Sequence, residues 1–186
     1  MPFTKIDASN LGGTTLPALN GSALTNISAG KVLQVVSSTS STETSTNSTS
    51  FSDTGLNVNI TPSSSSSKIL IIVNHTGLLK EASDNAGQIE LGRTISGGSF
   101  SSIRTFETNF GRNNSTALNV VGGTGTSCLD SPNTTSAINY KTRFRCDMSA
   151  SNTVRVQQNN CTASITAMEI STWLIILLNV LKQYKF

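Results

Sequence analysis

Histidine is the side chain that most often serves as a general base, and this chain of 186 residues contains one, His75. It lies in Asn74-His75-Thr76, directly after an apolar run, where the pattern predicts a loop or the end of a strand. A serine hydrolase of the α/β class would place its nucleophile in a Gly-x-Ser-x-Gly turn, and no such motif accompanies this histidine. We therefore interpret His75 as a structural residue and predict no catalytic residues.

Carboxylates and metal ligands give no catalytic pattern either. The ten Asp and Glu residues form no recognisable pair of the kind that glycosidases use, and Asp130 is interpreted as a turn residue before Pro132. Cys128, Cys146 and Cys161 lie in no Cys-x-x-Cys motif, so no zinc site or other cofactor is predicted. Because three cysteines cannot all pair within one chain, we expect three free thiols.

One glycine-rich segment could suggest a phosphate-binding loop. It is Gly122-Gly123-Thr124-Gly125, but the Lys-Ser/Thr that a P-loop requires does not follow it. We predict an ordinary loop there.

The one local concentration of positive charge is Lys141, Arg143 and Arg145. These residues alternate with an apolar set, which places them on the outward face of a strand: Tyr140, Thr142, Phe144, Cys146 and Met148. Two interpretations stay open: a solvated face with Asp147 as a partner, or a contact with an acidic neighbouring protein or an anionic surface glycan. The other basic residues are scattered, so nucleic acid is not an expected partner.

Composition indicates the elements that must carry these residues. Charged residues make up 12% of the chain, aromatic residues 5% and hydrophobic residues 36%, while Ser, Thr and Asn are abundant. A helical bundle or coiled coil would be rich in Ala, Glu, Lys, Leu and Arg, so this composition favours an all-β protein. A β-sandwich over residues 31–170, with roughly eight to ten short strands, is the predicted domain.

The strand patterns differ in what they predict about burial. Leu56, Val58 and Ile60 alternate with asparagines, which predicts one buried and one wet face. The run Lys68–Val73 is apolar throughout after Lys68 and predicts a central strand covered on both faces. Residues 37–50 are almost entirely Ser and Thr, and both a linker and a polar edge strand remain open. Residues 140–148 and 154–156 predict a hairpin closed by a turn over residues 149–152.

Both ends of the chain differ from the middle. Residues 1–30 are interpreted as an N-terminal stem or anchor, and residues 171–186 as an apolar C-terminal extension. That extension is shorter than a membrane-spanning helix, so no membrane insertion is predicted. We expect this extension to pack on apolar residues of the stem: Leu16, Leu19, Leu24 and Ile27. No signal peptide is visible, so we expect synthesis in the cytoplasm.

Three stretches resemble small β-domains of tailed bacteriophages, especially marine and cyanobacterial ones. They are residues 30–36, residues 50–70 with their Ser run, and residues 129–141 followed by the closing strand 164–170. Residues 16–25 resemble the connector that precedes such domains in phage fibres. The resemblance covers residues 10–170 and implies a virion structural protein with a jelly-roll fold of the TNF-like kind, assembled as a homotrimer. It brings no catalytic, cofactor-binding or metal-binding residues.

The expected function is therefore a non-enzymatic virion appendage, either a fibre or a capsid decoration. Its expected partners are two further copies of the chain, other virion proteins bound through the stem, and a host cell-surface glycan. Two alternatives remain: a carbohydrate-binding module without a role in the virion, and a tail-borne polysaccharide-cleaving enzyme. The chain has one Trp and two Tyr residues, few for stacking on sugars.

Overall fold

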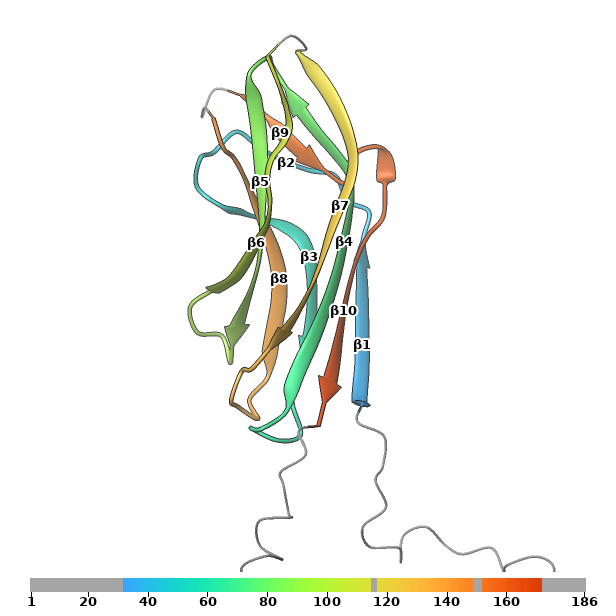
Figure 1. The fold of residues 1–186 in the computed structure, drawn as a ribbon, viewed down its shortest axis with the longest axis vertical. Coiled ribbons are helices and arrows are strands. Elements are labelled where there is room, and N and C mark those ends of the chain that lie inside the picture. The colour runs from blue at the N-terminus through green and yellow to red at the C-terminus, as the bar shows by residue number, and fades with distance from the viewer. Residues whose placement is uncertain (1–31, 115–116, 149–151, 172–186) are drawn as a thin grey trace, which may run out of the picture. The chain divides into compact units, whose positions relative to one another are not determined.

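The computed structural model describes residues 32–114, 117–148 and 152–171, which form an almost entirely β structure (Figure 1). The predicted stem over residues 1–30 and nearly all of the extension over residues 171–186 lie outside this described part. The strands are β1 (Val32–Ser40), β2 (Thr44–Thr46), β3 (Ser52–Ile60), β4 (Lys68–Glu81), β5 (Asn85–Ile95), β6 (Ser101–Asn113), β7 (Leu118–Asp130), β8 (Ile138–Cys146), β9 (Val154–Val156) and β10 (Ala163–Ile170), with one 3-10 segment, η3 (Gln158–Asn160), before β10.

The longer strands pair as one hairpin folded on itself. β5 pairs with β6, β4 with β7, β3 with β8 and β1 with β10, all antiparallel. Each pair encloses the previous one in sequence, so the chain runs out through one set of strands and returns beside it. Rolling this ribbon gives two facing sheets with strand orders β1-β10-β4-β7 and β3-β8-β5-β6 (Figure 1). This is a jelly-roll β-sandwich, and the predicted fold class is confirmed.

The short strands β2 and β9 extend the first of these sheets. β9 pairs with β4 at Leu79 and Lys80, and β2 pairs with β9, which makes this sheet six-stranded. The other sheet has four strands. Residues 37–50 thus contribute the end of β1 and the whole of β2, which favours the edge-strand interpretation over the linker.

The core lies between the two sheets in two apolar clusters. The larger cluster includes Ile69, Ile71 and Val73 of β4 packed against side chains of β3, β8 and β10. The smaller cluster contains Leu78, Ile89, Phe110, Phe144, Cys146, Val154 and Val156, and Phe106 packs against both clusters. Burying one such aliphatic or aromatic side chain contributes roughly 1.5–3 kcal/mol, so these clusters are the main source of stability.

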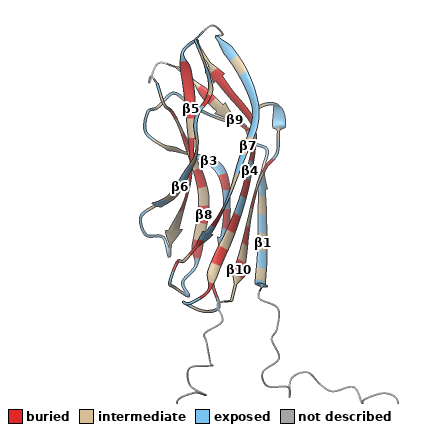
Figure 2. Cartoon of the chain, in the orientation of Figure 1, coloured by how far each residue is buried: buried red, intermediate tan, exposed pale blue. Residues whose placement is uncertain are grey.

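The inward and outward alternation of β4 corrects one prediction. Ile69, Ile71 and Val73 are buried, whereas Ile72 is 42% exposed and Leu70 is half-buried. Described residues therefore cover the apolar run on one face only, and the prediction of cover on both faces is wrong for this part of the chain. Figure 2 shows buried and exposed positions alternating along β4.

The predicted hairpin between residues 140–148 and 154–156 is also wrong. β8 pairs with β3 and β5, which occupy both of its edges, so β9 pairs instead with β2 and β4 in the opposite sheet. The alternation within each strand is confirmed, because Phe144, Cys146 and Val154 are buried. Met148 is 39% exposed rather than buried with the inward side chains of β8, since β8 ends at Cys146.

The glycine-rich segment forms part of a strand rather than the predicted loop. Gly122–Gly125 lies inside β7 and pairs with β4. A β-carbon on Gly123 would lie 2.6 Å from the carbonyl oxygen of His75, and one on Gly125 would lie 2.8 Å from that of Val73. Glycine is required at these positions because the two backbones approach so closely.

Candidate interaction faces

The predicted basic ridge lies on the outer face of the four-stranded sheet. Lys141, Arg143 and Arg145 alternate along β8 with buried Tyr140, Thr142 and Phe144, as the sequence predicts. Of the acids that meet them, Asp53 lies on β3 and Glu90 on β5, while Asp147 directly follows β8. Lys141 Nζ lies 2.8 Å from Asp53 Oδ2, Arg143 Nη1 lies 3.6 Å from Glu90 Oε1, and Arg145 Nη2 lies 3.0 Å from Asp147 Oδ1. The local positive charge is therefore balanced by carboxylates.

Two phenylalanine rings complete this surface. The guanidinium carbon of Arg143 lies 4.6 Å from the centre of the Phe100 ring, and that of Arg145 lies 4.9 Å from the centre of the Phe51 ring. Arg143 also donates to the carbonyl oxygen of Phe51 over 2.6 Å. Cation–π contacts of this kind contribute about 0.5–1 kcal/mol at exposed sites. We call this surface the paired-charge face; it consists of Phe51, Asp53, Glu90, Phe100, Lys141, Arg143, Arg145 and Asp147.

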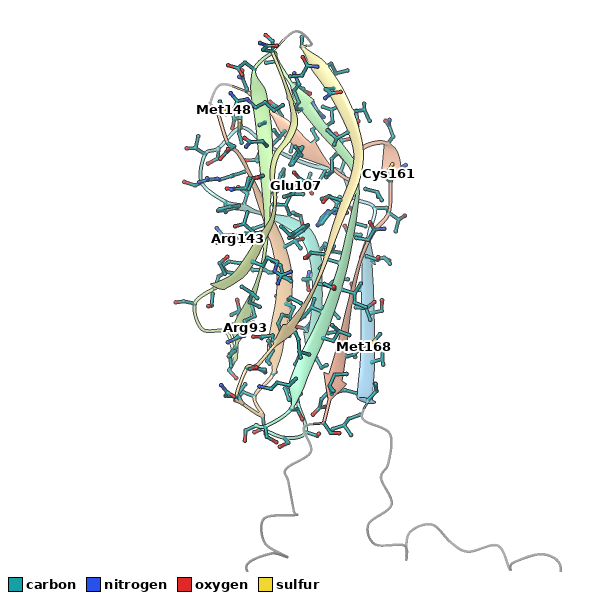
Figure 3. All side chains as sticks on the ribbon, in the orientation of Figure 1. Arg93, Glu107, Arg143, Met148, Cys161 and Met168 are labelled. Atoms are coloured by element: carbon teal, nitrogen blue, oxygen red, sulfur yellow. The ribbon has the colours of Figure 1, made fainter. Side chains whose placement is uncertain are left out.

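The outer face of the six-stranded sheet has a different chemistry. Val35 pairs with Met168, Met168 with Leu70, and Leu70 with Leu129, so one apolar row crosses β1, β10, β4 and β7. Val35 is 55% exposed and Leu129 is 60% exposed. We call this surface the apolar face; it consists of Val35, Leu70, Ile72, Leu129, Met168 and Ile170. Figure 3 shows Met168 and Arg143 on opposite sides of the sandwich.

The outer surface beside this row is polar and carries little charge, whereas the β2–β9 end of the sheet carries Arg155 paired with Glu43 and Glu81. The row beyond the apolar one pairs Ser37 with Thr166, Thr166 with Ile72 and Ile72 with Ser127. The Ser37 and Thr166 hydroxyl oxygens lie 3.0 Å apart. In the parts of β1, β10, β4 and β7 that carry these two rows, the charged residues are Lys68, Asp130 and Glu169, and both carboxylates are buried. Depletion of charge is typical of surfaces that become the core of an interface.

His75 lies in the core rather than at the end of a strand. It occupies the middle of β4, is fully buried, and its Nε2 atom lies 2.8 Å from Thr142 Oγ1 of the opposite sheet. Thr142 Oγ1 in turn lies 2.6 Å from Thr54 Oγ1. Burial lowers the pKa of His75 from 6.5 to about 4, so the ring is neutral at pH 7. This supports the structural interpretation of His75.

A second polar link joins the sheets near the ends of β7 and β5. The Tyr140 hydroxyl donates to Asp130 Oδ2 over 2.7 Å, and Arg93 forms an ion pair with Asp130 Oδ1. Burial, and then the hydrogen bond to Asp130, raise the pKa of Tyr140 above its usual range. Asp130 also accepts the N–H of Ser131. It is the last residue of β7 rather than a turn residue, so the sequence interpretation is wrong here and also missed the buried ion pair.

Glu169 is a buried carboxylate that sequence reasoning did not single out. Its Oε1 atom accepts from the backbone N–H and the hydroxyl of Ser63, and its Oε2 atom accepts from Gln34 Nε2. Burial alone would raise its pKa, but hydrogen bonds from Gln34, Ser63 and Ser67 outweigh burial and lower the pKa to about 2. The Ser run before β4 thus serves to hold this carboxylate.

The cysteines occupy structural positions. Cys128 and Cys146 are buried and Cys161 is half-buried, and none is bonded to another cysteine. Burial raises the pKa of the Cys128 thiol. Within the ranges that the structure describes, no three His, Cys, Asp or Glu side chains gather closely enough to hold a metal ion. Nor does any helix there have the length and hydropathy needed to cross a bilayer.

One shallow hollow of about 280 Å³ lies beside the paired-charge face. Asn59, Asn139, Thr94, Ser96 and Lys141 contribute to its lining. The Asn139 amide donates to Asn59 Oδ1 over 2.9 Å and to Asn57 Oδ1 over 3.1 Å. The hollow is therefore lined by amides, hydroxyls and one ammonium group together with Gly97, Ala137 and Ile138.

Comparison with known proteins gives no family. No protein-family model matches the chain, and no curated protein matches it. Solved structures with a similar arrangement include three from infectious bursal disease virus. Its VP2 subviral particle is 12% identical over 75% of this chain and 37% of its own, with a TM-score of 0.36. The structure of its Gt strain is 12% identical over 75% of this chain and 38% of its own, with a TM-score of 0.34. The structure of its Gx strain is 13% identical over 75% of this chain and 38% of its own, with a TM-score of 0.28. The chain thus spans well under half of these proteins, and likeness at this level says nothing about what it does.

Proposed function

We propose that this chain is a non-enzymatic structural protein of a tailed-phage virion, a homotrimeric fibre or capsid decoration assembled in the host cytoplasm. The observation that carries the proposal is the jelly-roll sandwich with an apolar row across β1, β10, β4 and β7 on the outer face of its six-stranded sheet. Contiguous exposed apolar residues on a soluble chain mark a surface that another group covers. The resemblance of residues 10–170 to phage β-domains supports the placement in a virion.

The buried titratable groups support a structural role over a catalytic one. His75 and Asp130 each join one sheet to the other, and Glu169 holds the Ser63 turn. In an enzyme, such groups converge on a cleft with a nucleophile and an oxyanion site. Here their hydrogen bonds and ion pair connect separate strands and turns. Such connections slow unfolding, which a particle component needs outside the cell.

Two measurements test this proposal. Light scattering of the purified chain at micromolar concentration should give the mass of three copies, and a monomer mass would contradict the trimer. Electron microscopy of intact particles carrying a labelled chain should place it on the head, neck or tail. Absence of the chain from purified particles would overturn the virion role, and release of reducing sugar from host polysaccharide would favour the enzyme alternative.

The hollow favours a second candidate function, attachment to a host-surface glycan. Amide and hydroxyl groups are suited to the hydroxyl groups of a sugar, and Phe100 lies close by on the same face, with Lys141 Nζ 5.7 Å from its ring centre. Asn139→Ala should abolish binding of a soluble host oligosaccharide in a calorimetric titration. Asn74→Ala, an exposed asparagine on the opposite sheet, is the matched control. Equal binding by both variants would remove the hollow as the attachment site.

A further inference from the structure

The apolar face is concentrated at one end of the six-stranded sheet. Its principal row, Val35–Met168–Leu70–Leu129, lies next to the start of β1 and the end of β10. The next row keeps Ile72 and the rows after it carry Ser, Thr, Asn and Gly, while Leu118 and Val120 are exposed at the far end of β7. Neighbouring strands are about 4.8 Å apart, so the row is roughly 14 Å wide. Any group that covers this row must therefore be apolar and must sit where the chain leaves the sheet.

The chain supplies such a group directly after β10. Ile170 is the last residue of β10 and belongs to the apolar face, and Trp173 follows three positions later. Residues 173–178 are all apolar, the apolar stretch continues to Leu181, and Lys182 ends it. Nine residues span roughly 13 Å as a helix and roughly 30 Å when extended. An extended segment is long enough to cross the row, and a helix covers most of it.

We propose that residues 173–181 pack on the apolar face of the same chain. The segment is tethered at Ile170, so its effective concentration at the face is in the millimolar range, well above that of a separate chain at micromolar concentration. The stem residues expected as the partner from sequence are not needed. A face covered in this way does not also join the copies of the proposed trimer, which would then meet through other surfaces.

Trp173 makes the proposal directly measurable, because it is the only tryptophan in the chain. In the full-length protein we expect the blue-shifted emission and slow acrylamide quenching of a buried indole. Leu129→Lys places a charge in the apolar row at a side chain that is 60% exposed, so the sandwich itself should remain folded. This variant should shift the emission to that of a solvated indole and raise the quenching constant several-fold.

Val120→Lys is the matched control, since Val120 lies on the same strand β7 and is 61% exposed but outside the apolar face. It should leave the Trp173 emission unchanged. Circular dichroism of both variants confirms the fold. The proposal would be overturned if the Trp173 emission of the unmodified protein were that of a solvated indole, or if Leu129→Lys left the emission wavelength unchanged. A red shift of the unmodified protein on dilution would also overturn it, because the cover would then come from a second copy.

Discussion

The outer faces of the two sheets are built on the same alternation of strand residues, yet they present opposite chemistry. On the four-stranded sheet the outward positions carry arginine, lysine and carboxylates that neutralise one another under two phenylalanine rings. On the six-stranded sheet the corresponding positions are valine, leucine, isoleucine and methionine, followed by hydroxyl residues. Alternation fixes which positions point inwards and which point outwards. The type of residue at the outward positions depends on what each face meets.

The two faces should also respond to different solution conditions. Ion pairs dominate the four-stranded face, and salt screens exposed charges over ~10 Å at 0.1 M. The described groups with lowered pKa values, His75 and Glu169, belong to the six-stranded sheet. Acid should therefore act mainly on the six-stranded sheet. Salt should weaken ion pairs on both sheets, because Arg155 of β9 pairs with Glu43 and Glu81 beside the six-stranded sheet.

The largest effect is expected from breaking the link at Asp130. Arg93→Met leaves the buried Asp130 carboxylate without its cation, and loss of one partner of a buried ion pair costs about 3–5 kcal/mol. Arg112→Met is the control, because Arg112 and its partner Asp84 are 51% and 60% exposed and such pairs contribute about 0–1 kcal/mol. Urea unfolding of both variants measures the difference. Equal losses would show that Arg93 does not join the sheets.

Acid should weaken the sandwich through His75. Its pKa is about 4 in the fold against 6.5 when unfolded, so the unfolded chain binds more protons between these values. Stability is then complete above pH 6.5 and falls by about 3 kcal/mol as the pH drops to 4. Glu169 adds a further loss below pH 4.5. His75→Gln should flatten the slope between pH 6.5 and 4, and an unchanged slope would assign it to other groups.

A smaller effect is expected on the paired-charge face. Arg143→Met removes the cation beside Glu90, which is 5% exposed and keeps a hydrogen bond from Ser102. We expect a loss of about 1–3 kcal/mol, as for a buried group left partly unsatisfied. Lys141→Met should cost less, because its partner Asp53 is 56% exposed. If the lysine variant loses as much, burial of the acid does not decide the energy.

The smallest effect concerns Arg145 and Asp147. They lie two residues apart on the outer surface, and a double-mutant cycle should give a coupling of about 0.2–1 kcal/mol at low salt. In 1 M NaCl, where the Debye length is about 3 Å, this coupling should disappear. A coupling that survives salt would indicate a surface less open to solvent than the described residues suggest.

The sequence predicted the strands better than their partners. Alternation at Leu56, Val58 and Ile60 and along β8 was correct because inward positions must be apolar whichever strand lies beside them. The pairing of β9 with β2 and β4 could not be read from residues 140–156, because a nearby strand is only the default partner and distant segments already occupied both edges of β8.

Buried charges were the other omission. Asp130 and Glu169 each look ordinary in sequence, one before a proline and one near the end of an alternating strand. Their partners are remote, since Arg93 precedes Asp130 by a whole hairpin and Ser63 lies 106 residues before Glu169. The basic ridge was found because its residues are local, while the carboxylates Asp53 and Glu90 that balance it were not.

The nested pairing of strands has a mechanical consequence. Val32 and Ile170 are register partners on neighbouring antiparallel strands, so the domain is entered and left at a single point. A force pulling these two residues apart would break the hydrogen bonds between β1 and β10 one after another. Strands pulled from opposite ends would instead have to break these bonds together. The domain is therefore better suited to a side attachment than to a position in a chain that carries force through both of its ends.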